Sequence, residues 1–268
     1  MKNWINNLIA FLRFIFKSKL PVVPQSPAPI VVAPGPVVQP PEPAIVLPGE
    51  DERPGRLIAD WIVDYMEKKN YLIDRNPKNG NIVYISESRD YFEINPESAD
   101  EWDDQRIIVK FREDGKPYID FSQSASTEPG TISRQSAAAK KLGGVATVVP
   151  GQYKAWKMGF HKHNFDHPAL VQCANITIWR DRNENARFDN EMMFSGVYGI
   201  NQHSTKPGFS GPRIGLWSAG CLVGKNFEQH LEFLDRLKQW ECYKANPECI
   251  FYTTIIPGKA LYGIQNHA

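Results

Sequence analysis

The chain has 268 residues, with 31 lysines and arginines against 30 aspartates and glutamates. That near-neutral balance excludes a protein that coats nucleic acid through a basic surface, so we expect no nucleic-acid partner. Hydrophobic residues make up 42% of the chain and charged residues 23%, which excludes wholesale disorder. The four cysteines form no CxxC pair, which argues against a disulfide scaffold and against a structural zinc site.

Residues 1–20 predict an amphipathic helix. Apolar residues recur there at helical spacing, while asparagines and basic residues gather on the opposite side. Such a helix is suited to lie in a membrane interface. A secretory signal is the main alternative because Lys2 precedes the apolar stretch, although Arg13 interrupts it, and docking on another protein is a third. We expect a membrane-associated or export segment, with possible membrane contact as its role.

Residues 21–54 predict a linker. Eleven prolines fall between Pro21 and Pro54, and no charged residue appears in this segment before Glu42. Proline at this density removes backbone donors and favours extended polyproline II, which makes a semi-rigid spacer. A ligand for an SH3-type domain is the alternative interpretation.

Residues 55–262 have the composition of one globular domain. Helical periodicity predicts helices near 57–66 and 226–240. Between them, short runs rich in β-branched and aromatic residues predict strands, with hairpin signals at Asn79-Gly80 and Asp114-Gly115. The predicted strands are 81–85, 106–111, 118–122, 145–149, 175–179, 196–200 and 249–256. Because the strands follow one another in series, we expect a mainly β, mostly antiparallel fold with a few peripheral helices.

The segment HKHNFDH (161–167) is a weak candidate for metal binding. Imidazoles two positions apart on a strand would point to one face, and His161, His163 and His167 together would suit a transition metal. No HExxH motif accompanies them. A polar loop at the mouth of a cleft is the preferred interpretation, and we expect no metal.

The segment DRNENARFD (181–189) places oxygen-bearing side chains at alternate positions, as in the opening of a calcium loop. Ala186 stands where such a loop needs glycine, and no bidentate glutamate follows. A hairpin tip whose Asn and Asp side chains bond their own backbone explains the pattern without an ion.

Two of the remaining features concern cysteines. Cys242 and Cys249 lie seven positions apart and would form a bridge in an oxidising compartment, which the sequence does not decide. Cys173 lies in an apolar run and is expected to be an inert buried thiol.

The strongest motif is GVYGINQHSTKPGFSGPRIGLWSAGCLVG (196–224), in which His203 precedes Cys221 by eighteen positions. A cysteine that attacks an amide needs a nearby base, and a histidine that ends one strand supplies it if the cysteine begins the facing strand. Gly220 allows close backbone approach, and the backbone N–H groups around Gly220 and Cys221 would form an oxyanion hole. The intervening loop is long enough to wall a cleft. The alternative is a core cysteine and a surface histidine that never meet.

The elements HS and SAGC at this spacing resemble the signature of the YkuD-type L,D-transpeptidase catalytic domain, in a divergent branch. The resemblance implies an L,D-transpeptidase-like β-sandwich, with Cys221 as the nucleophile and His203 as its base. It further implies that the Ser204 carbonyl orients the imidazole, that Gly220 allows close approach and that Ser218 braces the turn. Similarity to that branch also extends over 125–130, 150–162 and 169–172. It implies that the following residues line the cleft: Tyr153, His161 and Gln172.

Two positions depart from the family pattern. Ala219 replaces the histidine that normally stands two positions before the cysteine, and Val223 replaces a polar residue two positions after it. The second loss removes a substrate contact and puts acceptor preference in question. Three further residues flank the reacting strands and are expected substrate contacts: Tyr198, Arg213 and Trp217.

The motif therefore predicts a cysteine acyl-transfer enzyme that acts on peptidoglycan stem peptides without a metal or organic cofactor. Resolution of its thioester by an amine gives a cross-link, and resolution by water gives carboxypeptidase or endopeptidase activity. A catalytically inactive wall-binding module and a metal hydrolase built on the histidine cluster are the alternatives. An anchor followed by a long tether favours a cell-envelope or periplasmic location, and a phage-type or delivered lytic effector is the other possibility.

Overall fold

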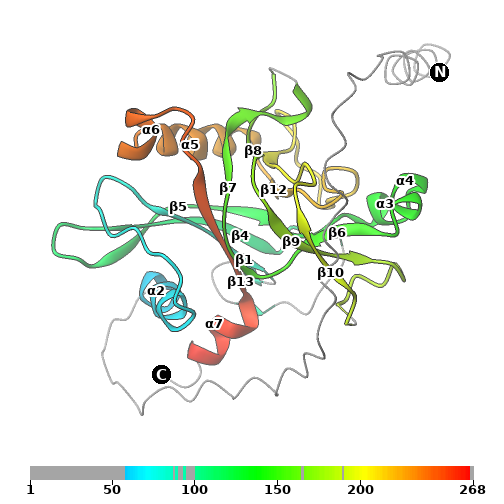
Figure 1. The fold of residues 1–268 in the computed structure, drawn as a ribbon, viewed down its shortest axis with the longest axis horizontal. Coiled ribbons are helices and arrows are strands. Elements are labelled where there is room, and N and C mark those ends of the chain that lie inside the picture. The colour runs from blue at the N-terminus through cyan, green and yellow to red at the C-terminus, as the bar shows by residue number, and fades with distance from the viewer. Residues whose placement is uncertain are drawn as a thin grey trace. The chain divides into compact units, whose positions relative to one another are not determined.

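The computed structural model describes residues 58–86, 88–89, 93–94, 100–163, 166–188 and 190–265 (Figure 1). The predicted anchor or export segment (1–20) and linker (21–54) lie outside these residues. None of the described helices has the length and apolar character that a membrane crossing requires.

The main sheet is a closed barrel of eight strands in the order β1-β13-β7-β8-β11-β12-β5-β4 (Figure 1). All neighbouring pairs are antiparallel except β1 with β13 and β11 with β12. The strands are β1 (Asn81–Ser86), β4 (Asp104–Phe111), β5 (Pro117–Ser126), β7 (Gly151–Phe160), β8 (Pro168–Gln172), β11 (Gln202–Ser204), β12 (Leu222–Gly224) and β13 (Phe251–Pro257). The prediction of a mainly β, mostly antiparallel fold is confirmed. The predicted β-sandwich is not confirmed, because the main sheet closes into a barrel.

A second sheet has the order β10-β9-β6, and a two-stranded one pairs β2 with β3. Their bounds are β2 (Ser88–Arg89), β3 (Glu93–Ile94), β6 (Val145–Val148), β9 (Ile176–Asp181) and β10 (Met193–Gly196). Ile176 and Ile178 of β9, together with Val148 of β6, belong to the same buried cluster as the barrel interior. The three-stranded sheet and the barrel therefore share one core.

The helices lie at the margins of the barrel, as predicted. They are α2 (Ile58–Lys68), α3 (Thr131–Arg134), α4 (Ala137–Lys141), the 3₁₀ turn η1 (His161–His163), α5 (Phe227–Lys238), α6 (Glu241–Ala245) and α7 (Gly258–Gln265). Both predicted helices are present, at α2 and α5. Asn226 caps α5 through its side-chain oxygen, which accepts from the Gln229 amide at 2.8 Å. Figure 1 places α5 and α6 at one end of the barrel and α2 and α7 at the other.

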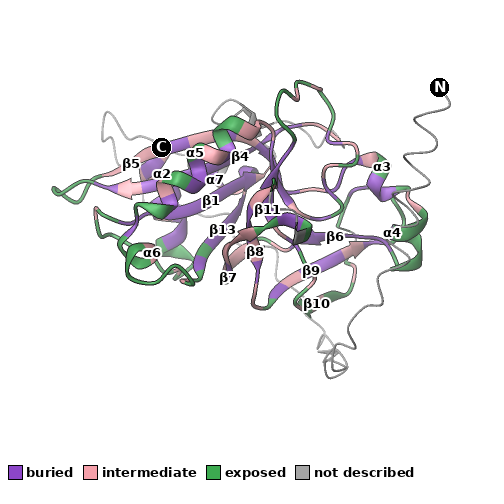
Figure 2. Cartoon of the chain, turned by 90° about the horizontal axis from the view of Figure 1, so that it is seen from above, coloured by how far each residue is buried: buried purple, intermediate pink, exposed green. Residues whose placement is uncertain are grey.

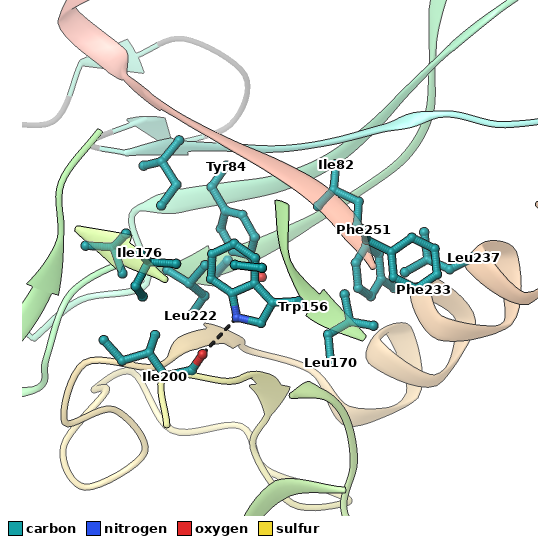
Figure 3. Packing of buried hydrophobic residues seen from close by; sticks show 14 of the residues in the cluster. Ile82, Tyr84, Trp156, Leu170, Ile176, Ile200, Leu222, Phe233, Leu237 and Phe251 are labelled. Carbon is teal, nitrogen blue, oxygen red and sulfur yellow. Dashed lines mark hydrogen bonds between the residues drawn. The ribbon is translucent and has the colours of Figure 1, made fainter. Parts of the chain in front are cut away.

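Strands β1 and β4 are buried on both faces, which explains their continuous apolar runs (Figure 2). Along β1, Ile82 and Tyr84 join the barrel core, whereas Val83 and Ile85 pack in a separate cluster with α2. Trp156 lies at the centre of the barrel core, where its indole N–H donates to the Ile200 carbonyl at 2.8 Å (Figure 3). This bond ties the loop before β11 to the middle of the core.

A buried cation lies inside the barrel. The Arg106 guanidinium is 3.0 Å from His230 Nδ1, and it stands 4.2 Å from the ring centroid of Phe233. Arginine only donates, so His230 accepts at Nδ1 and donates from Nε2 to the Pro168 carbonyl, 2.9 Å away. This arrangement requires neutral His230, and burial, followed by the charge of Arg106, holds the pKa of His230 well below its usual value. The network joins β4, β8 and α5.

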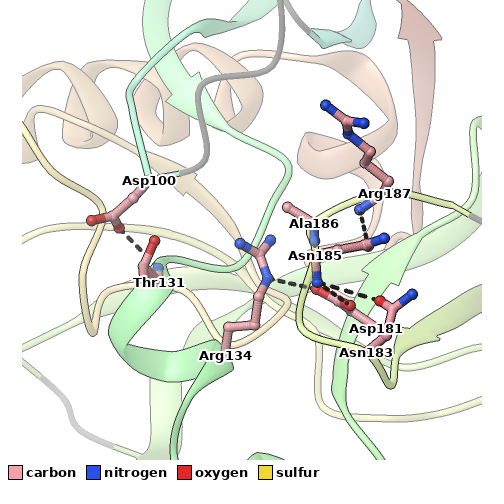
Figure 4. A network of polar contacts seen from close by, with 8 residues as sticks. All are labelled: Asp100, Thr131, Arg134, Asp181, Asn183, Asn185, Ala186 and Arg187. Atoms are coloured by element: carbon pink, nitrogen blue, oxygen red, sulfur yellow. Dashed lines mark hydrogen bonds and ion pairs between the residues drawn. The ribbon is translucent and has the colours of Figure 1, made fainter.

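Residues 181–188 belong to a hairpin tip between β9 and β10, and its polar side chains bond their own backbone, as predicted (Figure 4). Asp189 lies outside the described residues. Asp181 accepts from the amides of Asn185 and Ala186 at 3.1 and 3.0 Å. Its buried carboxylate also pairs with Arg134 of α3 at 2.7 Å. The carboxylate is therefore satisfied by protein groups, which accounts for this acidic cluster without an ion.

The thiols of Cys242 and Cys249 are free and 3.4 Å apart, and Cys173 is half-buried just after β8. A disulfide needs its sulfurs about 2.05 Å apart, so a small local movement joins the first two. We expect oxidised glutathione to form this bridge and to be reduced to two glutathione thiols in the exchange. The chain then loses two hydrogen atoms, which lowers its mass by about 2 Da, and its two thiols are protected from alkylation. Cys242→Ser serves as the control and should show no intramolecular bridge. Full alkylation of both thiols after oxidation would contradict the prediction.

Candidate active site

Two short parallel strands bring His203 and Cys221 together. His203 lies in β11, and Cys221 immediately precedes β12, with His203 paired to Val223 in the register. A ring nitrogen of His203, a ring nitrogen of His161 and the Cys221 sulfur all lie within 4.8 Å of one another. The histidine and the cysteine therefore lie close together. The alternative, in which a core cysteine and a surface histidine never meet, is wrong.

His203 is buried, with one ring nitrogen hydrogen-bonded and the other without a hydrogen-bond partner. Its Nδ1 is 2.8 Å from the Ser204 carbonyl, which accepts, so Nδ1 carries the proton. Its Nε2 is buried and has no hydrogen-bond partner. Burial, followed by the nearby His161, holds the pKa of His203 well below its usual value. The ring is therefore neutral at pH 7, with an unprotonated Nε2 available as a base.

Cys221 is half-buried, and its sulfur is 3.9 Å from the Gly199 carbonyl. Burial raises the pKa of the thiol above its usual value, although the Asn201 backbone opposes this by hydrogen bonding. Since the thiol pKa rises and the imidazole pKa falls, the resting pair consists of a neutral thiol and a neutral imidazole. Proton transfer must then accompany attack instead of preceding it.

The turn before Cys221 depends on Ser218 and Gly220. The Ser218 hydroxyl donates to the Cys221 carbonyl at 2.8 Å and accepts from the Gly220 amide at 3.2 Å. Gly220 has φ = +132°, and a Cβ there would stand 2.6 Å from the Ala146 carbonyl, so the turn requires glycine. Because Ser218 already occupies the Gly220 N–H, the Cys221 N–H is the better oxyanion donor of the two that the motif implied.

Two further imidazoles surround His203. His161, at the end of β7, stacks on it with centroids 3.9 Å apart, and His167 approaches edge-on at 5.1 Å. His167 Nε2 donates to the Ser204 carbonyl at 2.9 Å, so that carbonyl accepts from two imidazoles. Burial lowers the pKa of His161 to about 4, so this ring too is neutral. The segment 161–167 thus contributes to the site through His161 and His167, and the side chain of His163 lies outside the described residues.

Asn201 fixes the orientation of His161. Its side-chain oxygen accepts from the Gln172 amide at 3.0 Å, so its NH₂ group faces His161 Nδ1 at 3.2 Å. His161 therefore accepts at Nδ1 and carries its proton on Nε2. Asn201 was not among the predicted site residues, and His167 was predicted only as a candidate metal ligand. The histidine motif contained the signal for His167, whereas nothing in the local pattern distinguished Asn201.

Gln172 braces the loop that precedes β11. Its amide oxygen accepts from the N–H groups of Tyr198 and Ile200 at 2.9 and 3.0 Å, and its NH₂ donates to two carbonyls. These bonds replace a strand partner, which explains why 197–200 is not the predicted strand and β10 ends at Gly196. Tyr198 is half-buried against the core, and the Tyr153 hydroxyl donates to the Val149 carbonyl at 2.7 Å. For Gln172 and Tyr153 these contacts describe structural roles, and contact with substrate stays a prediction.

The loop between His203 and Cys221 carries the other expected contacts. Trp217 is half-buried against Phe209, and both pack with the small cluster of Trp102, Ile214 and Val223. Cys221 also packs against this cluster, which is why an apolar Val223 fits where the family has a polar residue. Two positions face outward instead: Ala219 is exposed, and Arg213 is 61% exposed.

No protein-family model, no curated protein and no solved structure matches this chain.

Proposed function

We propose that this protein is a cysteine-dependent acyl-transfer enzyme acting on peptidoglycan stem peptides, a divergent relative of the L,D-transpeptidases. Two observations carry the proposal: Nε2 of His203 is buried without a hydrogen-bond partner, and a ring nitrogen of His203 lies within 4.8 Å of the Cys221 sulfur. Burying a polar nitrogen without a partner costs free energy, which is accounted for if the nitrogen receives a proton during a reaction. The L,D-transpeptidase-like arrangement of two layers is part of the proposal, and the core that the two sheets share supports it.

In the proposed reaction, Nε2 of His203 takes the thiol proton as the Cys221 sulfur attacks the carbonyl carbon that precedes a D-residue. The Cys221 amide stabilises the resulting oxyanion. Collapse of this intermediate breaks the C–N bond, and the imidazolium returns its proton to the leaving amine. A second amine, or water, then attacks the thioester and releases the thiol.

His161 supplies a second imidazole in this proposal. The family places that group two positions before the cysteine, where this chain has Ala219. Here His161 reaches the cluster from the end of β7, and Asn201 holds its Nε2–H tautomer. An N–H donor beside the sulfur stabilises negative charge as it develops there. His161 in this way supplies the imidazole that is lost where Ala219 replaces the family's histidine.

Peptidoglycan as the substrate implies a location in the cell envelope or periplasm, with delivery as a wall-lytic effector the alternative. The test incubates the purified full chain with defined disaccharide peptides and analyses the products by mass spectrometry. We expect cross-linked dimers or shortened stems with the wild type and none with Cys221→Ala. Cys242→Ala is the matched control and should retain activity. Product formation by Cys221→Ala would overturn the cysteine mechanism.

The same cluster supports a second candidate function, a zinc-dependent hydrolase with His161, His203 and Cys221 as ligands. Zinc–ligand bonds are about 2.0–2.3 Å, and catalytic zinc sites use three protein ligands drawn from imidazoles, thiolates and carboxylates. Atoms within 4.8 Å of one another would need to move slightly closer. A chelator distinguishes the two functions: activity that survives dialysis against 1,10-phenanthroline supports the thiol enzyme, and activity that is lost and restored by Zn²⁺ supports the hydrolase.

A further inference from the structure

A polar cavity of about 470 Å³ lies on another side of the loop that leads to Cys221. Its walls come from the segment before β4, from β4, β5 and the end of β12, and from the loop between β11 and β12. This volume is within the range of small-molecule pockets. Trp102 lines the cavity and also belongs to the cluster against which Cys221 packs. The cavity and the proposed nucleophile thus share one wall.

Two cations on the wall of this cavity have hydrogen-bond donors to offer. The ammonium of Lys225 makes no ion pair with any described residue. Arg213 approaches Glu101 at 3.6 Å, which is longer than a hydrogen bond, so its guanidinium retains donors to offer. The Trp102 side chain, which is 7% exposed, also lines the cavity. Two cations in one cavity favour a ligand with a carboxylate.

One acidic group limits the choice of ligand. Glu101 lines the same cavity and holds Arg213 both by the ion pair and by an isolated antiparallel bridge between the two backbones. A plain anion placed between the cations meets the repulsion of Glu101. A carboxylate with a neighbouring ammonium satisfies both signs, because its ammonium faces Glu101 while its oxygens face the donors.

We propose that this cavity is a binding site for an amino-acid zwitterion, such as a free D-amino acid, which carries both an ammonium and a carboxylate. The binding site requires no reaction at Cys221 and goes beyond the acyl-transfer proposal. If both hold, the cavity recognises a group of the substrate that carries both an ammonium and a carboxylate, and Arg213, Glu101 and Lys225 determine which substrates are accepted.

The experiment uses the full chain carrying Cys221→Ala, so that binding is measured without chemistry. D-Alanine and 2,6-diaminopimelate are the zwitterionic probes, acetate and phosphate the anionic ones, and ethylamine the cationic one. Binding is followed by calorimetry and by the indole N–H resonance of Trp102, which is identified by its absence in Trp102→Phe. We expect at least one zwitterion to shift this resonance and to bind about tenfold or more tightly than acetate or ethylamine.

Three variants test the residues individually. Arg213→Gln should weaken zwitterion binding about tenfold. Glu101→Gln should weaken zwitterion binding and leave acetate binding unchanged or stronger, and Arg182→Gln, an exposed site outside the cavity, should change nothing. Binding of acetate or phosphate as tight as that of both amino acids would overturn the proposal, and so would an unshifted Trp102 resonance with every probe. These outcomes are independent of activity in the wild type, so the two proposals can fail separately.

Discussion

Replacing His203 by Gln is expected to lower kcat/KM for stem-peptide cleavage about a thousandfold, within the range that general bases contribute. Glutamine keeps a donor for the Ser204 carbonyl but has no group that accepts the thiol proton at neutral pH. His167→Gln is the matched control, because it removes an imidazole that donates to the same carbonyl and retains an N–H. We expect it to stay within about fivefold of the wild type. Equal losses in the two variants would mean that the imidazoles act only structurally.

The pH profile of the wild type follows from the same geometry. The proposed reaction requires unprotonated His203, whose pKa lies well below its usual value because the ring is buried. The acid limb of kcat/KM should therefore lie below pH 6.5, the ordinary histidine value. The thiol pKa is raised by burial, so Cys221 should be alkylated by iodoacetamide slowly at pH 7 and faster in alkaline solution. An acid limb at or above pH 6.5 would contradict the assignment of His203 as the base.

The second large effect is a loss of stability in mild acid. Burial is the main cause that lowers the pKa of three histidines, His161 to about 4 and both His203 and His230 well below the usual value. Below pH 6.5 the unfolded chain binds protons that the folded chain does not, so the free energy of unfolding falls as pH falls. His161 alone accounts for about 3 kcal/mol between pH 6.5 and 4. The other two act with the same sign.

A typical domain is stable by only about 5–15 kcal/mol, so we expect this one to unfold between about pH 5 and 4. Urea titrations at pH 7, 6, 5 and 4.5 measure the slope. His161→Gln lowers stability at pH 7 because the stack on His203 is lost, but its slope should be smaller by about 1.4 kcal/mol per pH unit, one proton. An unfolding free energy that is constant from pH 7 to 5 would show that the histidines are not desolvated.

The parts of the fold that could be predicted are those with a strong local pattern. Periodicity identified α2 and α5, and apolar runs identified β1, β4 and β13. Strands β11 and β12 have three residues each, which is too short for any pattern, and their existence depends on pairing with distant segments. Apolar and polar residues alternate poorly along β7, because residues on both of its faces are half-buried. Barrel closure depends on long-range hydrogen bonds and was therefore not foreseen.

The site was predictable only where its residues lie in one motif. The spacing of His203 and Cys221 predicted that these two residues lie close together, and the Ser204 carbonyl accepts a hydrogen bond from the His203 ring as the resemblance implied. Asn201 could not be identified, because its role depends on a hydrogen bond from Gln172, which lies on another strand. The segment 161–167 was predicted to be a loop at a cleft, but its contacts with His203 could not be predicted, for the same reason. His161 follows β7 and His203 lies in β11. Only the strand order β7-β8-β11 in the barrel brings these two residues together.

The position of β13 in the barrel has a consequence for how the protein is made. β13 is the last strand in the chain, yet it lies between β1 and β7 and hydrogen-bonds to both. During synthesis the ribosome releases β1 and β7 long before the strand that must join them, so their edges stay open until residues 251–257 emerge. The barrel therefore cannot be completed until β13 has been synthesised. The nascent chain stays available to chaperones, or to a translocation channel that accepts only unfolded polypeptide, until residues 251–257 have emerged.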